Sequence, residues 1–215
     1  MKQTTFRSIF LFAVVTLVTA SANASPLSHR TGFLSVAKGP FLRDDSAIKD
    51  NVLRRVDKIS DTLRLDQQLS MKLDAIDPVR VVIAKDGFNE DVIRNAIVLV
   101  EGNLKANLIQ NSIVIVIGKV QANDIRGSVV ASADDLTAYH AGGRDQDSLL
   151  MTTGQANITA AYTTTLLAEK GAKVQSPTHL TAINTKVRTP HPTRVRYQYV
   201  RENVLEGIAG LLSAN

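Results

Sequence analysis

The sequence contains no cysteine and none of the usual motifs of catalysis. Without cysteine the chain can form no disulfide, no thiolate metal site, no thiol nucleophile and no lipid-modified cysteine. Its histidines are scattered and form no His-x-x-x-His pair, and neither a Gly-x-Ser-x-Gly elbow nor a phosphate-binding loop is present. We therefore expect no catalytic residue, no metal and no cofactor, and a core that holds by packing alone.

Only one segment combines length with continuous apolarity. Residues 9–18 (IFLFAVVTLV) follow Lys2 and Arg7 and precede an Ala-Asn-Ala triplet, which supplies small residues where a signal peptidase reads them. We predict a signal peptide over residues 1–24, and hence export to the periplasm, the cell surface or the medium. The alternative is an uncleaved membrane anchor, although the run is shorter than the roughly 20 residues that span a bilayer. No integral membrane segment is expected after cleavage.

A sixteen-residue repeat occupies the middle of the chain. Residues 94–109, 110–125 and 126–141 align so that like falls under like, and a degenerate earlier unit covers residues 78–93. The register then slips by four residues at 142–145 before a further echo of the repeat. A short fixed period is typical of a solenoid, in which each unit buries its apolar face only by stacking on its neighbours. The aligned positions include Asn95, Asn111 and Gly127; Ile97, Ile113 and Val129; and Ala106, Ala122 and Ala138.

The composition of the repeat indicates strands and turns. The units are rich in Val and Ile, carry Asn, Gly and Asp at fixed offsets, and are too short for two helices and a turn. We predict a mainly β fold, namely a single-stack parallel β-solenoid of about five coils of roughly 16–20 residues over residues 78–201. The alternative is a meander of antiparallel hairpins, since the Glu-Gly-Asn at 101–103 could reverse the chain. The identical register of successive units favours the solenoid.

The segments around the repeat differ from it in pattern. Residues 25–44 contain Pro and Gly among mixed residues and are expected to form an irregular lead-in. Residues 45–77 have helical periodicity, and residues 202–215 suit a short helix that caps the open end of the solenoid. The apolar stripe of the first helical segment consists of Ile48, Val52, Val56, Ile59 and Leu63.

The strand segments are apolar at consecutive positions, so residues on both sides of them require burial. One side would face the solenoid interior and the other would need a cover. We predict that the amphipathic helical segment covers this second side; the alternative is a homo-oligomer that associates through it. The outward column is predicted to consist of Val82, Val98, Val114, Val130 and Leu150.

The clearest functional feature is a basic segment between residues 180 and 201 that contains neither Asp nor Glu. Period-two spacing would place Lys186 with Arg188, and Arg194 with Arg196, on a strand face opposite two tyrosines. Such a row suits the charged groups of an acidic polysaccharide or another envelope polyanion, and nucleic acid is not expected outside the cell. The alternative is a solvated edge strand protected by charge. The predicted polyanion-binding residues are Lys186, Arg188, Arg194, Arg196 and Arg201.

A second group of charged residues is acidic and flanks the slipped unit, with His140 among them. Carboxylates at solenoid turns could hold calcium, and with Arg126 or Arg144 they could serve a lyase-like, polysaccharide-active enzyme. The spacing fits no known ligand loop, however, and Asp is a favoured turn residue, so we predict no metal site. The group consists of Asp134, Asp135, Asp145 and Asp147.

The segment NSIVIVIGKVQA at residues 111–122 resembles the coils of exported bacterial β-helix proteins and of bactofilin-type polymerising solenoids. The resemblance covers about residues 81–168 and implies the solenoid architecture, which alone does not define a function. Our leading hypothesis is an exported, non-enzymatic scaffold or binding module at the cell envelope. The alternatives are a lyase-like enzyme that acts on polysaccharide and a self-assembling structural protein.

Overall fold

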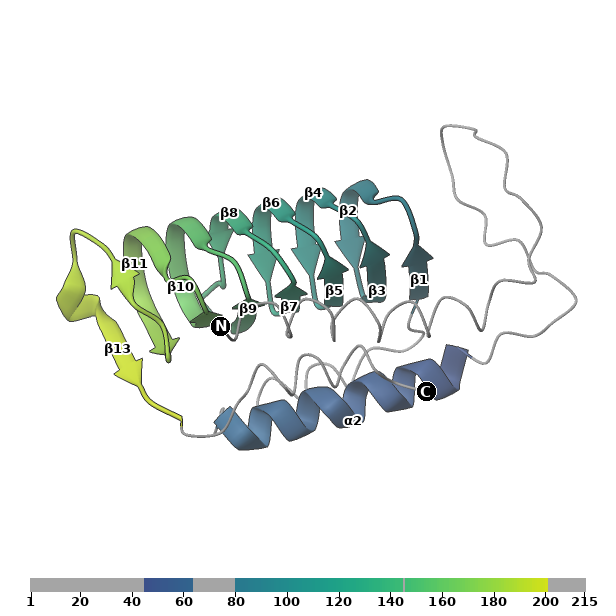
Figure 1. Cartoon of the computed structure of the whole chain (residues 1–215), viewed down its shortest axis with the longest axis horizontal. Helices are drawn as coiled ribbons and strands as arrows, with labels where there is room; N and C mark the ends of the chain where they lie inside the picture. Colours follow the sequence, from purple (N-terminus) through teal and green to yellow (C-terminus); the bar gives the residue numbers. More distant parts are fainter. Residues whose placement is uncertain (1–44, 64–79, 145, 201–215) are drawn as a thin grey trace, which may run out of the picture.

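The computed structural model describes residues 45–63, 80–144 and 146–200, which form a parallel β-solenoid of about seven turns with one long helix beside it (Figure 1). The predicted fold class is confirmed, because every pairing between the named strands is parallel and the antiparallel meander is therefore wrong. The signal peptide, the lead-in and the C-terminal cap predicted at 1–24, 25–44 and 202–215 lie outside the described residues, as does the part of the predicted helical segment at 64–77.

The strands form two stacks, one on each broad side of the solenoid. We call the first the covered sheet; β13 and the second halves of the long strands β10 and β11 complete it. Its other strands are β1 (Arg80–Ala84), β3 (Ala96–Glu101), β5 (Ile113–Ile117), β7 (Val129–Ser132) and β9 (Ser148–Thr152), with β10 at Ala156–Ala168, β11 at Ala172–Ile183 and β13 at Val195–Gln198.

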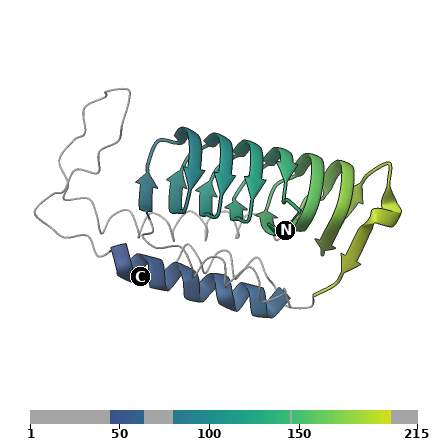
Figure 2. The ribbon, with the colours of Figure 1, turned by 180° about the vertical axis from the view of Figure 1, so that it is seen from behind.

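The second stack is called the open sheet, because no other described element lies over its outer side (Figures 1 and 2). The first halves of β10 and β11 belong to it. Its other strands are β2 (Phe88–Arg94), β4 (Leu104–Gln110), β6 (Val120–Arg126), β8 (Leu136–Ala141) and β12 (Val187–Arg188), and the 3₁₀ turn η1 (Pro192–Arg194) then leads to β13.

The strand register follows the sequence repeat and its one interruption. Ile113 pairs with Val129 across a sixteen-residue interval, whereas Val129 pairs with Leu149 across twenty, which confirms the predicted insertion of four residues. The sixteen-residue interval then resumes, as in the pairing of Ala156 with Ala172. The solenoid has about seven turns instead of the five predicted. The later coils were not recognised as repeats because they contain Ala and Thr where the earlier coils contain Val and Ile.

The helix α2 (Asp45–Leu63) runs along the stack beside the covered sheet (Figures 1 and 2). Its 19 residues give a length of about 28 Å, which matches about six steps between neighbouring strands. At its C-terminal end, the carbonyl oxygen of Leu63 accepts a hydrogen bond of 3.2 Å from Nε2 of Gln198 in β13. Among the described residues, no helix combines the length and apolarity that crossing a membrane requires.

The helix covers the sheet as predicted, but the predicted column was wrong by one residue. Val98 and Val114 point into the solenoid and pack with residues of the open sheet, so their column offers no surface for self-association. Ile97 and Ile113 point outward instead and pack with the helix. The helix contributes the buried residues Val52, Val56, Ile59 and Leu63 to this outer cluster.

Candidate functional site

The outer side of the open sheet presents polar side chains in columns, one residue from each coil. In β4 and β6 the burial alternates, with Leu104 and Val120 buried inside and Lys105 and Gln121 exposed outside. One column forms an amide ladder, in which Nδ2 of Asn123 donates to Oδ1 of Asn107 at 2.8 Å. Nδ2 of Asn107 in turn donates to Oδ1 of Asp91. These stacked side chains link neighbouring coils of the solenoid.

The predicted basic residues lie around the last turn of the solenoid but do not form one row. Lys186 belongs to the turn before β12, and Arg188 lies on the open sheet. Arg194 is the last residue of η1, whereas Arg196 lies in β13 of the covered sheet. The prediction of two period-two pairs was therefore wrong, and Arg201 lies outside the described residues.

Two further basic residues, Lys170 and Lys173, extend this region, and the sequence prediction missed them. Lys173 pairs in register with Arg188, which places the two backbones one strand spacing apart on the open sheet. Residues 170–200 contain no acidic residue, so the sequence carried the signal for this extension. We call the group the basic end; its residues Lys170, Lys173, Lys186, Arg188, Arg194 and Arg196 are all exposed.

The tyrosines near the basic end do not both belong to its surface. Tyr197 pairs in register with Ala182, a residue of the solenoid interior. Its hydroxyl lies 3.5 Å from the carbonyl oxygen of Val187, which belongs to the other sheet. The ring therefore extends across the open end of the core, while Tyr199 is 80% exposed.

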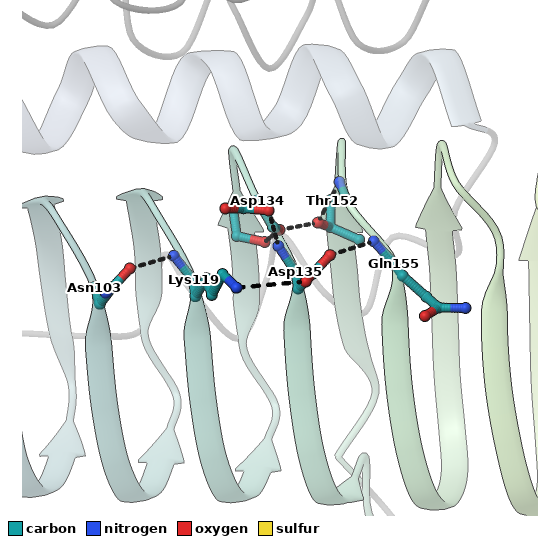
Figure 3. A network of polar contacts seen from close by, with 8 residues as sticks. Asn103, Lys119, Asp134, Asp135, Thr152 and Gln155 are labelled. Atoms are coloured by element: carbon teal, nitrogen blue, oxygen red, sulfur yellow. Dashed lines mark hydrogen bonds and ion pairs between the residues drawn. The ribbon is translucent and has the colours of Figure 1, made fainter.

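The predicted acidic group is divided between opposite corners of one coil. Asp134 and Asp135 lie in the turn between β7 and β8, and Asp147 lies in the turn between β8 and β9. Oδ1 of Asp134 accepts a hydrogen bond from the Asp135 amide, and Oδ1 of Asp135 accepts one from the Gln155 amide, both at 2.9 Å (Figure 3). These carboxylates therefore hold turns together. Asp145 lies outside the described residues.

The same corner shows why Asn, Lys and Asp follow one another along the stack. The side-chain oxygen of Asn103 accepts a hydrogen bond of 2.9 Å from the Lys119 amide, as Asp135 does for Gln155 two turns further on (Figure 3). The ammonium group of Lys119 also lies 3.8 Å from the Asp135 carboxylate. No group of three potential metal ligands among His, Cys, Asp and Glu occurs in the described parts of the chain.

A mixed polar and aromatic cluster lies on the open sheet next to the four-residue insertion. Nδ1 of His140 lies 3.0 Å from Oδ1 of Asp124, which also accepts a hydrogen bond of 3.3 Å from Arg126. The Tyr139 ring stands edge-on to the His140 ring, with 4.6 Å between the ring centroids. The Tyr162 ring is tilted relative to the His140 ring, and their centroids lie 6.3 Å apart. We call this group, Asp124, Arg126, Tyr139, His140 and Tyr162, the His140 cluster.

The insertion is a compact turn that borders this cluster. Gly143 and Gln146 form an antiparallel bridge, and the hydroxyl of Thr163 donates to the Gly143 carbonyl oxygen. Gly142 has a φ of 76° and a hypothetical Cβ there would lie 2.5 Å from the Thr163 carbonyl oxygen, so glycine is required. The coil thus departs from its repeat at the place where exposed aromatic rings gather, and such departures are typical of functional sites.

The His140 cluster was not predicted, although part of its signal was present. Asp124 and His140 are one repeat apart, so the solenoid register alone places them side by side on neighbouring coils. Tyr162 is 22 residues after His140, because the insertion separates it from the regular interval. Its place in the cluster therefore becomes clear only from the structure of the turn that contains the insertion.

Comparison with known proteins returns no matching family model, no matching curated protein and no matching solved structure.

Proposed function

We propose that this protein is an exported, non-enzymatic binding module that uses the basic end and the open sheet to hold an acidic polysaccharide at the cell envelope. The observation that carries the proposal is the charge of residues 170–200, which include six basic side chains and no acidic one. All six are exposed, and none forms an ion pair with another described residue.

The placement of these charges suits an extended polymer. Lys173 and Arg188 are successive members of one outward column, about 4.8 Å apart along the stack. Their column continues into Asn157, Thr137 and Gln121, which offer hydrogen bonds without opposing charge. A polyanion that follows this column from the basic end would meet two cations, then three neutral polar side chains, and then the exposed Lys105 next to Gln121. Exposed cations attract such a polymer over several ångströms.

Binding without catalysis is supported by how the chain uses its carboxylates. Asp134 and Asp135 hold a turn, and Asp147 lies at the opposite corner of the coil, so these groups are not poised together for acid–base chemistry. Export is supported by the signal-peptide pattern of residues 1–24.

The proposal is tested with the purified full chain and polygalacturonate, a polymer of carboxylated sugars. We expect retention at low salt and release at high salt, because exposed charge pairs are screened. The variant Lys173→Gln/Arg188→Gln should bind roughly tenfold more weakly, since each exposed ion pair contributes at most about 1 kcal/mol.

The matched control is Arg80→Gln/Lys85→Gln, which removes two exposed cations from the first coil at the other end of the stack. The control should bind as the wild type does. Equal loss in both variants would show that only net charge matters, and the basic end would then not be the site. Shortened polymer after incubation would contradict the non-enzymatic part of the proposal.

A further inference from the structure

The His140 cluster places three aromatic rings beside the polar columns of the open sheet. Tyr139 and Tyr162 are 57% and 42% exposed, so each leaves much of a ring in solvent. The chain contains four tyrosines in all. Of these, Tyr139 lies in β8, and Tyr162 directly follows the half of β10 that belongs to the open sheet. Tyrosine is enriched at binding interfaces, because its ring packs on an apolar face of a partner while its hydroxyl forms a hydrogen bond.

The polar members of the cluster are fixed in orientation. Because Oδ1 of Asp124 is an acceptor 3.0 Å from Nδ1 of His140, the proton of a neutral imidazole resides on Nδ1. Nε2 is then a free acceptor, directed away from the carboxylate. Arg126 is held by the same oxygen at 3.3 Å and is still exposed. The cluster therefore offers an acceptor and a cation around aromatic surface.

The neighbouring coils leave room beside the rings. In the column that contains His140, the next two members toward the basic end are Ala160 and Ser176, which are both small. The step from the coil of His140 to the coil of Arg188 spans three strand spacings, or about 14 Å. An extended polymer could therefore lie over the small residues and reach both sites at once.

We infer that the His140 cluster binds a pyranose ring of the acidic polysaccharide, while Lys173 and Arg188 bind acidic groups further along the same chain. This inference rests on the proposed function and adds the ligand's chemical class and its direction along the stack. A pyranose ring combines an apolar C–H face, which packs on Tyr139 or Tyr162, with hydroxyls that donate to His140 Nε2 and accept from Arg126.

The four tyrosines make a direct test possible, because ring-selective NMR of the full chain yields few signals. The probes are oligogalacturonate and inorganic polyphosphate, which is anionic but contains no sugar ring. Oligogalacturonate should shift the ring signals of Tyr139 and Tyr162, whereas polyphosphate should bind the basic end and leave those signals in place. Oligo(dT), which has both charge and stacking bases, tests the nucleic-acid alternative.

Variants separate stacking from folding. Tyr139→Ala/Tyr162→Ala should weaken oligogalacturonate binding about tenfold and leave polyphosphate binding unchanged. Tyr139→Phe, which keeps the ring and loses only the hydroxyl, should weaken oligogalacturonate binding less than the double alanine variant does. The control Tyr199→Ala removes an exposed ring outside the cluster and should also have no effect.

Each result has one meaning. Loss of binding in Lys173→Gln/Arg188→Gln with full binding in the double tyrosine variant would overturn this inference and leave the proposed function standing. No binding of any anionic probe would overturn both. Oligo(dT) that binds as tightly as oligogalacturonate and shifts the same two rings would overturn the assignment of a sugar.

Discussion

Replacing Val56 by Asp tests whether the helix is what keeps the covered sheet out of water. Val56 is 1% exposed and packs in the cluster that contains Ile97 and Ile113. The four buried apolar residues of the helix contribute roughly 6–12 kcal/mol in gross burial, at about 1.5–3 kcal/mol each.

A carboxylate at this position has no partner in the apolar cluster, and burying it costs several kcal/mol. We therefore expect Val56→Asp to detach the helix while the solenoid, which has its own interior cluster, stays folded. The outward apolar residues of the covered sheet would then be exposed and would cause association between molecules.

Two measurements follow the expected change. Circular dichroism should show loss of helical signal with the β signal retained, and light scattering should show growth that depends on protein concentration. Arg54→Asp places a carboxylate on the exposed side of the same helix and should remain monomeric. The reasoning is refuted if Val56→Asp stays monomeric with full helical signal.

Two further predictions concern the corners of the coil. At Gly118 a Cβ would lie 2.3 Å from the Gly102 carbonyl oxygen, so Gly118→Ala should destabilise the fold by about 1–3 kcal/mol and lower Tm by several degrees. The control Gly143→Ala should change Tm little, because the nearest atom to its Cβ would lie at 3.6 Å. Equal Tm values for the two variants would contradict this prediction. Asp135→Ala removes the acceptor for the Gln155 amide and should lower the free energy of unfolding, measured by chemical denaturation, by about 1 kcal/mol. Asp135→Asn keeps Oδ1 and should retain most of the stability. An equally large loss in both variants would count against a stabilising role for this hydrogen bond.

The fold could be predicted in large part because residues one repeat apart in the sequence pair with each other on neighbouring coils. The sixteen-residue interval and its four-residue slip specified which residues become neighbours, as in the pairing of Val129 with Leu149. The inward and outward columns were exchanged because Ile113 and Val114 are both apolar and both buried, so composition does not distinguish the interior from the helix side. A one-residue error exchanges the two faces of a strand.

The proposed binding surface was predicted less well, for physical reasons that differ between its two parts. At the basic end, Pro190 and Pro192 and the 3₁₀ turn interrupt the strand, so alternation could not place Arg194 and Arg196 on one face. In the His140 cluster, the pair of Asp124 and His140 follows from the register, whereas Tyr162 joins through the inserted corner. The repeat pattern thus predicts which strands pair, but it does not predict the conformation of irregular turns.

Mapping the bound polymer by backbone amide NMR of the full chain tests the central claim most directly. On addition of oligogalacturonate, we expect the largest shifts along the open sheet, from residues 139–140 through 157–162 and 173–176 to 187–188. The amides of α2 and of the first covered strand, β1, should be unaffected. Shifts confined to α2 or β1, or spread evenly over the surface, would contradict the assignment of the open sheet and the basic end as the binding surface.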